Sequence, residues 1–177
     1  GIEAFRWTFK DGLQGLGDLP GGDFQSRALD ISDDGMRIVG NGAPTCLRYR
    51  YCSDALFWTH DGAMQTLRNP DDPQGSSEAM AISSDGRSIV GSVFAKLERR
   101  AARWRSPNAD PELLISPAKG IPSSEANDVS DDGLTVVGAT TNAGIIRAFR
   151  WTSEGGAREL GTLSGSDHSR AVAVSAD

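Results

Sequence analysis

Four short stretches of the chain alternate small or polar residues with larger apolar ones. Alternation with a period of two predicts a β-strand, because successive side chains of a strand point to opposite faces. One face would carry serine, alanine and a small or acidic residue, and the other would carry Leu29, Ile31 and their equivalents. We call this predicted strand a; its copies are SRALDIS at 26–32, SEAMAIS at 77–83, SEANDVS at 124–130 and SRAVAVS at 169–175.

A β-branched stretch that ends in glycine follows three of these strands after a polar turn. The copies read ISDDGMRIVG at 31–40, ISSDGRSIVG at 82–91 and VSDDGLTVVG at 129–138. An Asp-Gly pair between two strands is a strong hairpin signal, because glycine accepts the positive φ that the turn needs. The alternative is a calcium loop, but Ca²⁺ takes six to eight oxygen ligands and each copy supplies at most two carboxylates. We therefore expect a hairpin that leads into a strand b.

The four tryptophans mark a third strand, c, in every copy of the repeat. They are Trp7, Trp58, Trp104 and Trp151, spaced 51, 46 and 47 residues apart. A leucine-containing strand d follows each strand c. A four-stranded antiparallel unit of about 47 residues has the length and strand count of a propeller blade. A helical repeat is the alternative, but no window shows apolar residues at i, i+3, i+4 and i+7 over three turns.

The predicted fold class is therefore all-β, a β-propeller-like array of four-stranded antiparallel blades. Tryptophan and the aliphatic residues of strand b should pack between neighbouring sheets, because one unit cannot bury its own face. The whole chain, 1–177, forms one repeat domain: a partial blade at 1–25, repeats at 26–76, 77–123 and 124–168, and a partial blade at 169–177. A four-bladed ring closed from these strands would lack one strand b. We therefore expect a segment of a longer array, or closure by strands from another chain, with open edges that invite pairing.

These motifs together resemble a known bacterial repeat. The stretches AFRWT at 4–8, LGDLPGG at 16–22, DISDDG at 30–35 and IVG at 38–40 are similar to the probable extracellular repeat called the HAF family, and the similarity recurs along the chain to residue 177. The resemblance implies a secreted or cell-surface bacterial protein, sometimes an autotransporter passenger, with propeller-like repeats and no assigned catalytic activity. The family's His-Ala-Phe histidine is replaced by Glu3, Asp54, Arg100 and Arg147, so no histidine ligand is carried over.

Charge and hydropathy limit the classes of partner that this chain is expected to bind. The chain has 18 basic and 24 acidic residues, a formal net charge of −6, and no run of lysine or arginine that could follow a phosphate backbone. Nucleic acid is therefore not an expected partner. No stretch reaches the roughly 18 apolar residues of a membrane span, and the first residues lack the form of a signal peptide. From the family resemblance we expect an extracellular or cell-surface location, with the periplasm as the alternative.

The longest predicted b–c connection contains both cysteines and an aromatic, cationic stretch. Cys46 and Cys52 are not spaced as zinc or thioredoxin pairs are, so we interpret them as a local disulfide, which forms in an oxidising compartment; the alternative is two free thiols. Between them lie large planar residues that often anchor interfaces, namely Arg48, Tyr49, Arg50 and Tyr51. This loop could bind an acidic glycan or a protein, or could simply be an extended hairpin tip.

Asp30 and Asp128 are the candidate acids, because the other copies of strand a carry Ala81 and Ala173 there. If strand a is innermost, both could face a channel or a seam and hold a cation or perform acid/base work. Alternatively, they accept hydrogen bonds from nearby backbone or from arginines such as Arg27.

No GxSxG elbow, dinucleotide fingerprint or metal-ligand pattern is present, so we expect no cofactor and no metal. The sequence thus predicts a non-catalytic extracellular binding or structural propeller module with a glycan or protein ligand. One alternative is a propeller-type hydrolase or lyase that uses channel carboxylates. The other is an assembly module of a surface or filament protein, which self-associates through its terminal strand edges.

Overall fold

The computed structural model describes residues 1–21, 24–43, 53–70, 76–95, 98–115 and 123–176, and in these residues it contains strands and no helix. The first two strands form an N-terminal hairpin, β1 (Phe5–Thr8) and β2 (Gly12–Gly15). Three sheets of four strands follow it, which we call sheets I, II and III. The prediction of an all-β array of four-stranded antiparallel blades is therefore confirmed.

Each sheet is a meander in which neighbouring strands of the sequence pair antiparallel. Sheet I consists of β3 (Ser26–Ile31), β4 (Arg37–Gly42), β5 (Asp54–Thr59) and β6 (Met64–Thr66). Sheet II consists of β7 (Ser77–Ile82), β8 (Ile89–Ala95), β9 (Glu98–Trp104) and β10 (Glu112–Leu113). Sheet III consists of β11 (Ser123–Val129), β12 (Thr135–Asn142), β13 (Ile145–Thr152) and β14 (Gly156–Gly161).

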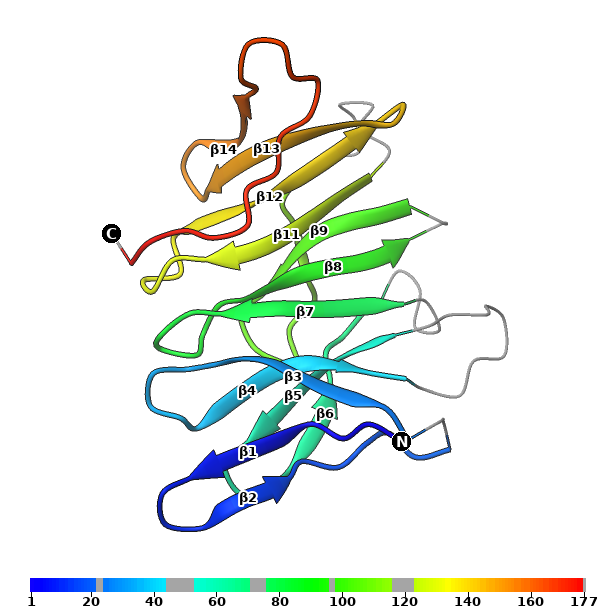
Figure 1. Ribbon diagram of the computed structural model, residues 1–177, viewed down its shortest axis with the longest axis vertical. Helices are drawn as coiled ribbons and strands as arrows, with labels where there is room; N and C mark the ends of the chain where they lie inside the picture. The colour runs from blue at the N-terminus through cyan, green and yellow to red at the C-terminus, as the bar shows by residue number, and fades with distance from the viewer. Residues whose placement is uncertain (22–23, 44–52, 71–75, 96–97, 116–122, 177) are drawn as a thin grey trace.

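The N-terminal hairpin and the three sheets follow one another in chain order along the long axis of the molecule (Figure 1). Strand a of each later sheet, β7 or β11, packs against strands of the sheet before it. The turns after strand a are joined directly, because the Asp33 amide donates to the Ser84 carbonyl and the Ser84 amide donates to the Asp131 carbonyl, both at 3.2 Å. The a strands therefore lie where the sheets approach most closely, as their small residues suggested.

The Asp-Gly stretches form the predicted hairpin turns. In the first, the carboxylate of Asp34 accepts hydrogen bonds from the Ser32 hydroxyl at 2.6 Å and the Met36 amide at 2.9 Å, and Gly35 has a φ of +67°. The same bonds recur around Asp85 and Asp132. The Ser32 hydrogen bond lowers the pKa of Asp34 from its usual value. These acids close turns between strands a and b.

A β-bulge in strand a explains the glycine that recurs in strand b. The register shifts between Ala28 and Asp30, and equivalent shifts occur in β7 and β11. Gly40, Gly91 and Gly138 lie opposite these bulges. A Cβ on Gly91 would lie 1.9 Å from the backbone oxygen of Glu78, which no side chain can tolerate. Glycine is therefore required by the close approach of the two strands.

The bulge corrects one detail of the predicted strand a. Strict alternation would place Ala79 and Ile82 on opposite faces, yet both pack into the seam between sheets I and II, while Ala81 packs into the seam between sheets II and III. The additional residue of the bulge reverses the alternation beyond it. The small residues of strand a therefore do not share one face.

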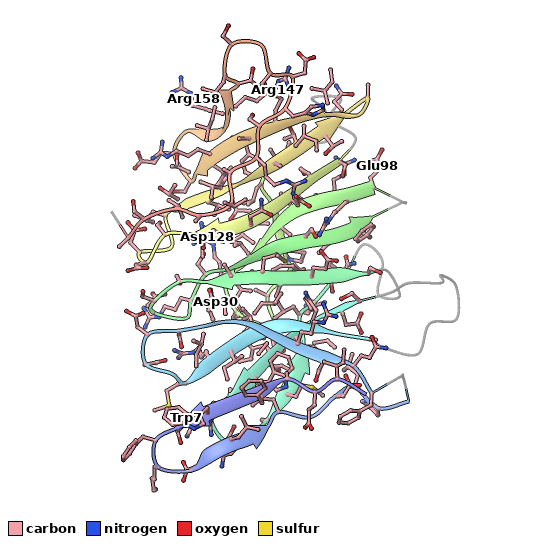
Figure 2. The ribbon with its side chains drawn as sticks, in the orientation of Figure 1. Trp7, Asp30, Glu98, Asp128, Arg147 and Arg158 are labelled. Carbon is pink, nitrogen blue, oxygen red and sulfur yellow. The ribbon has the colours of Figure 1, made fainter. Side chains whose placement is uncertain are left out.

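Three of the four tryptophans fill the seams between sheets, as predicted. Trp58 packs between the N-terminal hairpin and sheet I, Trp104 between sheets I and II, and Trp151 between sheets II and III. The indole of Trp104 also donates to the carbonyl of Arg68 at 2.8 Å. In the described residues no further sheet packs against Trp7, which is 62% exposed and lies at the lower end of the molecule in Figure 2.

The final predicted strand a does not form a strand in the described residues. Residues 169–176 run extended across sheet III instead (Figure 1). The Ser169 amide donates to the Ile146 carbonyl, and the Ala171 carbonyl accepts a bond from the side chain of Asn127. In sheets I to III strand a pairs with the strand b of its own sheet, whereas this segment bonds to the preceding sheet.

Candidate functional site: the inter-sheet acids and an apolar groove

Asp30 spans the boundary between sheets I and II. One carboxylate oxygen, Oδ1, accepts the amide of Ile31 in its own strand, and Oδ2 accepts the amide of Ile82 in β7, both at 2.8 Å. The acid at the end of strand a therefore connects one blade to the next through the backbone. Arg27, the alternative partner considered from the sequence, is not one of its hydrogen-bond donors among the described residues.

Asp128 repeats this arrangement one blade later. Its Oδ1 accepts the Val129 amide at 2.9 Å, and its Oδ2 accepts the Val174 amide of the terminal segment at 2.8 Å. Val174 is the repeat equivalent of Ile82, so both acids bond to the same position of the next strand a. Sheet II carries Ala81 at this position and makes no such link.

Burial of Asp30 affects its ionisation. Burial raises the pKa of Asp30 above its usual value, the hydrogen bonds from Ile82 and Ile31 lower it, and the negative charge of Asp128 raises it further. The two carboxylates thus interact electrostatically, and Figure 2 shows them on the same side of the stacked sheets. A site for acid/base chemistry would also need open space beside both acids.

A groove of about 260 Å³ lies beside the free edge of β1, and Asp30 contributes to its wall. Most of its lining is apolar, and Asp128 is not part of it. Phe5 and Trp7 line it from β1, while Leu29 and Ile31 line it from β3. These four side chains are exposed, although they are large, apolar and part of strands.

The sequence prediction did not select this groove, although the repeat contains the signal for it. Residues 4–19 contain copies of strands c and d, and residues 1–177 include no copies of strands a and b for the same blade. In sheets I to III, strands a and b cover the positions that are open beside β1. Alignment of the incomplete unit with the complete ones would therefore have identified Phe5, Trp7, Leu29 and Ile31.

A second cavity, also about 260 Å³, lies between the end of β6 and the start of β7. Its wall includes Asp54, Arg68, Asn69 and Ser77. Burial raises the pKa of Asp54, and its carboxylate has no hydrogen-bond donor among the described residues. Arg68 pairs with Asp110 at 3.1 Å, outside this cluster. The cavity is polar, and Asp54 is the charged group of its lining that has no partner among the described residues.

The remaining predicted site residues lie outside the described residues. They are Cys46, Arg48, Tyr49, Arg50, Tyr51 and Cys52. The disulfide and the loop surface therefore stay predictions. In the part of the chain that the structure describes, no group of three or more His, Cys, Asp or Glu residues could hold a metal ion, and no helix is long and apolar enough to cross a membrane.

Comparison with known proteins identifies the class of fold to which this chain belongs. No protein-family model matches the chain, and no curated protein matches it. Among solved structures, a TolB candidate from Agrobacterium tumefaciens superposes with a TM-score of 0.62 at 18% identity, over 85% of this chain and 53% of that chain. TolB from Acinetobacter baumannii superposes with a TM-score of 0.58 at 11% identity, over 90% of this chain and 37% of that chain.

A structure from a study of two prolyl endopeptidases is also similar, with a TM-score of 0.53 at 15% identity, over 91% of this chain and 24% of that chain. The chain spans about half the length of the first of these structures and less of the other two. At such identities the likeness concerns the fold. The chain is a propeller-type array of blades like that of the TolB structures, and none of the comparisons points to the HAF family in particular.

Proposed function

We propose that this chain is a non-catalytic, protein-binding module of the β-propeller type. One observation carries the proposal: the exposed apolar groove formed by Phe5, Trp7, Leu29 and Ile31. Contiguous exposed apolar surface is a common mark of a protein interaction site. Aromatic residues in such a surface are typical anchors of protein interfaces. Six of the eight lining residues are apolar, and Arg6 and Asp30 are the two charged ones, so we expect a polypeptide rather than a sugar as the ligand.

The catalytic alternative has less support from the acids. Both oxygens of Asp30 accept backbone hydrogen bonds, from β3 and β7, and both oxygens of Asp128 do so from β11 and the terminal segment. A general acid or nucleophile needs an oxygen that is available to a substrate. We assign the two acids to the joining of blades. The likeness to a prolyl endopeptidase structure concerns the fold and transfers no activity.

Substitution of Asp30 distinguishes the structural role from the catalytic one. Asp30→Ala removes the acceptor of the Ile82 amide, so we expect the free energy of unfolding to fall by about 1–3 kcal/mol, measured by urea denaturation. The structural role also predicts no turnover of chromogenic glycosides or peptide anilides by the unsubstituted chain. Turnover that disappears in Asp30→Asn and Asp128→Asn while the fold is retained would support the enzyme instead.

A selection without prior choice of ligand tests the binding function. A phage-displayed library of random peptides and an immobilised glycan array are offered to the purified chain and to the Ile31→Asp variant. Ile31 is about half exposed, so this variant should fold normally. We expect enriched peptides whose binding is lost in Ile31→Asp. Glycan binding without peptide enrichment, or peptide binding that Ile31→Asp leaves unchanged, would contradict the proposal.

The proposed location is outside the cytoplasm, at the bacterial cell surface or in the periplasm. This rests on the family resemblance and on the interpretation of Cys46 and Cys52 as a disulfide. Mass spectrometry of the native protein with and without reduction tests it. A gain of about two daltons on reduction is expected for one disulfide. Alkylation of both cysteines before reduction would remove this support.

Self-assembly is the second candidate function, since the edge of β1 is not paired in the described structure. An unpaired edge strand beside an apolar surface is a common route to association. Sedimentation velocity over a wide concentration range tests it. Oligomers that dissociate in the Ile31→Asp variant would favour the assembly module, whereas a concentration-independent monomer would favour binding of a different partner.

A further inference from the structure

The cavity between the end of β6 and the start of β7 has polar groups in its wall that have no partner among the described residues. Its volume is about 260 Å³, and its wall combines the polar Asp54 and Asn69 with the apolar side chains of Leu67 and Pro70. It shares no lining residue with the groove beside β1. An inference about this cavity therefore goes beyond the proposed function and does not depend on it.

Asn69 contributes a buried oxygen to the cavity wall. The residue is 8% exposed. Its side-chain Nδ2 donates to the carbonyl of Phe94 at 3.2 Å, and because a carbonyl only accepts, this bond fixes which end of the amide is the oxygen. That oxygen, Oδ1, is buried and has no hydrogen-bond partner among the described residues. A buried acceptor without a donor is costly, so its presence in the wall of a cavity indicates a donor that binds there.

Asp54 supplies a negative charge to the same cavity. Its repeat equivalent is Glu3, since each lies four residues before a tryptophan, and Glu3 accepts the amide of Gly17 at 3.0 Å. Asp54 is one methylene shorter and makes no such bond to the equivalent Arg68 in the described part of the chain. Burial raises the pKa of Asp54 above its usual value, which is the effect expected for a carboxylate that lacks both a donor and a neighbouring cation.

The basic residue in the lining, Arg68, is paired with a different acid. Its guanidinium lies 3.1 Å from the carboxylate of Asp110, and both side chains are more than half exposed. Its charge is therefore largely balanced outside the cavity. Two acceptors, the Asp54 carboxylate and the Asn69 oxygen, remain for a ligand, and apolar side chains lie beside them.

From these observations we propose that the cavity binds a primary ammonium group carried on a short alkyl chain. The ammonium donates one hydrogen bond to the carboxylate of Asp54 and one to Oδ1 of Asn69, and the alkyl chain contacts Leu67 and Pro70. An ammonium has N–H donors and no acceptor, which suits a site whose free groups are acceptors. The bond to the carboxylate is charge-assisted and supplies most of the affinity. A free amine and a lysine side chain share this chemistry.

A metal ion fits the cavity less well. Ca²⁺ takes about six to eight oxygen ligands, whereas the free side-chain acceptors here are one carboxylate and one amide oxygen. Across the described ranges of the chain, no group of three or more His, Cys, Asp or Glu residues could hold a metal ion. An ammonium requires no such coordination number, because it needs only acceptors for its N–H groups.

Titration of the complete chain with n-butylammonium chloride, followed by two-dimensional NMR, tests the proposal. We expect a saturable shift of the side-chain amide signals of Asn69 and of the backbone amides of Leu67 and Ser77. The matched control ligand is tetramethylammonium chloride at the same ionic strength, which has the same charge and no N–H donor. We expect it to cause no saturable shift of these signals.

Two variants test the role of the carboxylate. Asp54→Asn keeps the size of the side chain and removes its charge, so we expect it to weaken n-butylammonium binding by about tenfold or more. Asp33→Asn removes an exposed acid from a turn outside the cavity, and we expect it to leave the affinity unchanged. The comparison of the two ligands uses the unsubstituted chain, so it tests the proposal even if Asp54→Asn does not fold.

Nα-acetyl-lysine methylamide distinguishes the two sources of the ammonium. Tighter binding of this compound than of n-butylammonium would support a lysine side chain of a polypeptide, and weaker binding would support a free small amine.

Four outcomes would overturn the proposal. They are the absence of a saturable shift with either amine, equal affinity for n-butylammonium and tetramethylammonium, undiminished binding by a folded Asp54→Asn variant, and saturable shifts with calcium chloride alone. Each of these would leave the binding function of the groove untouched, because that function is tested separately with Ile31→Asp.

Discussion

At the scale of single residues, the glycine of strand b shows the strongest steric constraint in the repeat. The Cβ that Gly91→Ala introduces would lie 1.9 Å from the carbonyl oxygen of Glu78, so the bulge must open or the strands must separate. We expect the free energy of unfolding to fall by about 3 kcal/mol, the upper part of the usual range for overpacking. Urea denaturation measures it.

The control for this substitution is Gly155→Ala in the exposed β13–β14 turn. Its Cβ would meet only the hydroxyl of Thr152 at 3.1 Å, and the residue does not have a positive φ. The change in stability should stay within about 0.5 kcal/mol, as for surface positions in general. Equal effects of the two substitutions would show that the close approach of strands a and b does not explain the glycine.

Asp54 should make stability depend on pH in a direction opposite to that of most acids. Burial raises the folded-state pKa of Asp54 above its usual value near 3.8. The folded protein therefore keeps this proton to a higher pH than the unfolded chain does, and the ionised carboxylate disfavours folding above that pKa. Asp54→Asn should raise the melting temperature at pH 7 and leave it nearly unchanged at pH 3.

The exposed Asp33→Asn variant is the control for general charge effects, because it removes the same charge from a turn. A rise at pH 7 that Asp33→Asn reproduces in full would mean that net charge, and not burial of Asp54, is responsible. A loss of stability in Asp54→Asn at pH 7 would mean that the carboxylate has a partner in solution.

At the scale of elements, a serine at the start of strand a joins each blade to the next. The hydroxyl of Ser77 accepts the amide of Ala55 at 3.0 Å, and the same bond links Ser26 to Ala4, Ser124 to Ala101 and Ser169 to Ala148. Ala55 is fully buried. The serine at the first position of each strand a copy therefore has an identifiable structural role that periodicity alone did not indicate.

Ser77→Ala should leave the buried amide of Ala55 without an acceptor. An unsatisfied buried donor costs about 1–3 kcal/mol, and we expect the free energy of unfolding to fall by this amount. Equilibrium denaturation with urea measures it, and Ser153→Ala in an exposed turn is the matched control. A loss in the control as large as that in Ser77→Ala would indicate that the inter-sheet bond contributes nothing.

Element prediction worked where the signal is local. Asp-Gly turns, β-branched runs and the tryptophan spacing were enough to predict the strand types and their order within a blade. The bulge in strand a was missed, because it adds a residue without changing composition. The sequence signal of the bulge is the recurring glycine of strand b, at Gly40, Gly91 and Gly138. Why glycine is required there is clear only when strands a and b are seen paired.

At the scale of the whole molecule, burial of tryptophan depends on the presence of a preceding sheet. Trp104 is 0% exposed between sheets I and II, whereas Trp7 at the open end is 62% exposed. Trp104→Ala should therefore destabilise the protein by about 3–5 kcal/mol, and Trp7→Ala by about 0.5 kcal/mol or less. Urea denaturation of both variants provides the comparison.

Acrylamide quenching gives an independent measure of the same asymmetry. The unsubstituted chain should contain one accessible tryptophan, and Trp7→Phe should remove the accessible fraction of the fluorescence. Complete protection of Trp7 in the unsubstituted chain would mean that another molecule or a second copy already covers the end of the array.

The sequence alone determined the class of fold, the strand order within a blade and the positions of the turns. These depend on side-chain periodicity and on the backbone freedom of glycine, which act between residues close together in the chain. Tertiary structure decided where the same motif has different roles. Whether a tryptophan is buried, whether Asp30 faces a substrate or the amide of Ile82, and where an apolar groove remains open all depend on the sheet that lies alongside, and the repeat pattern is the same in each case.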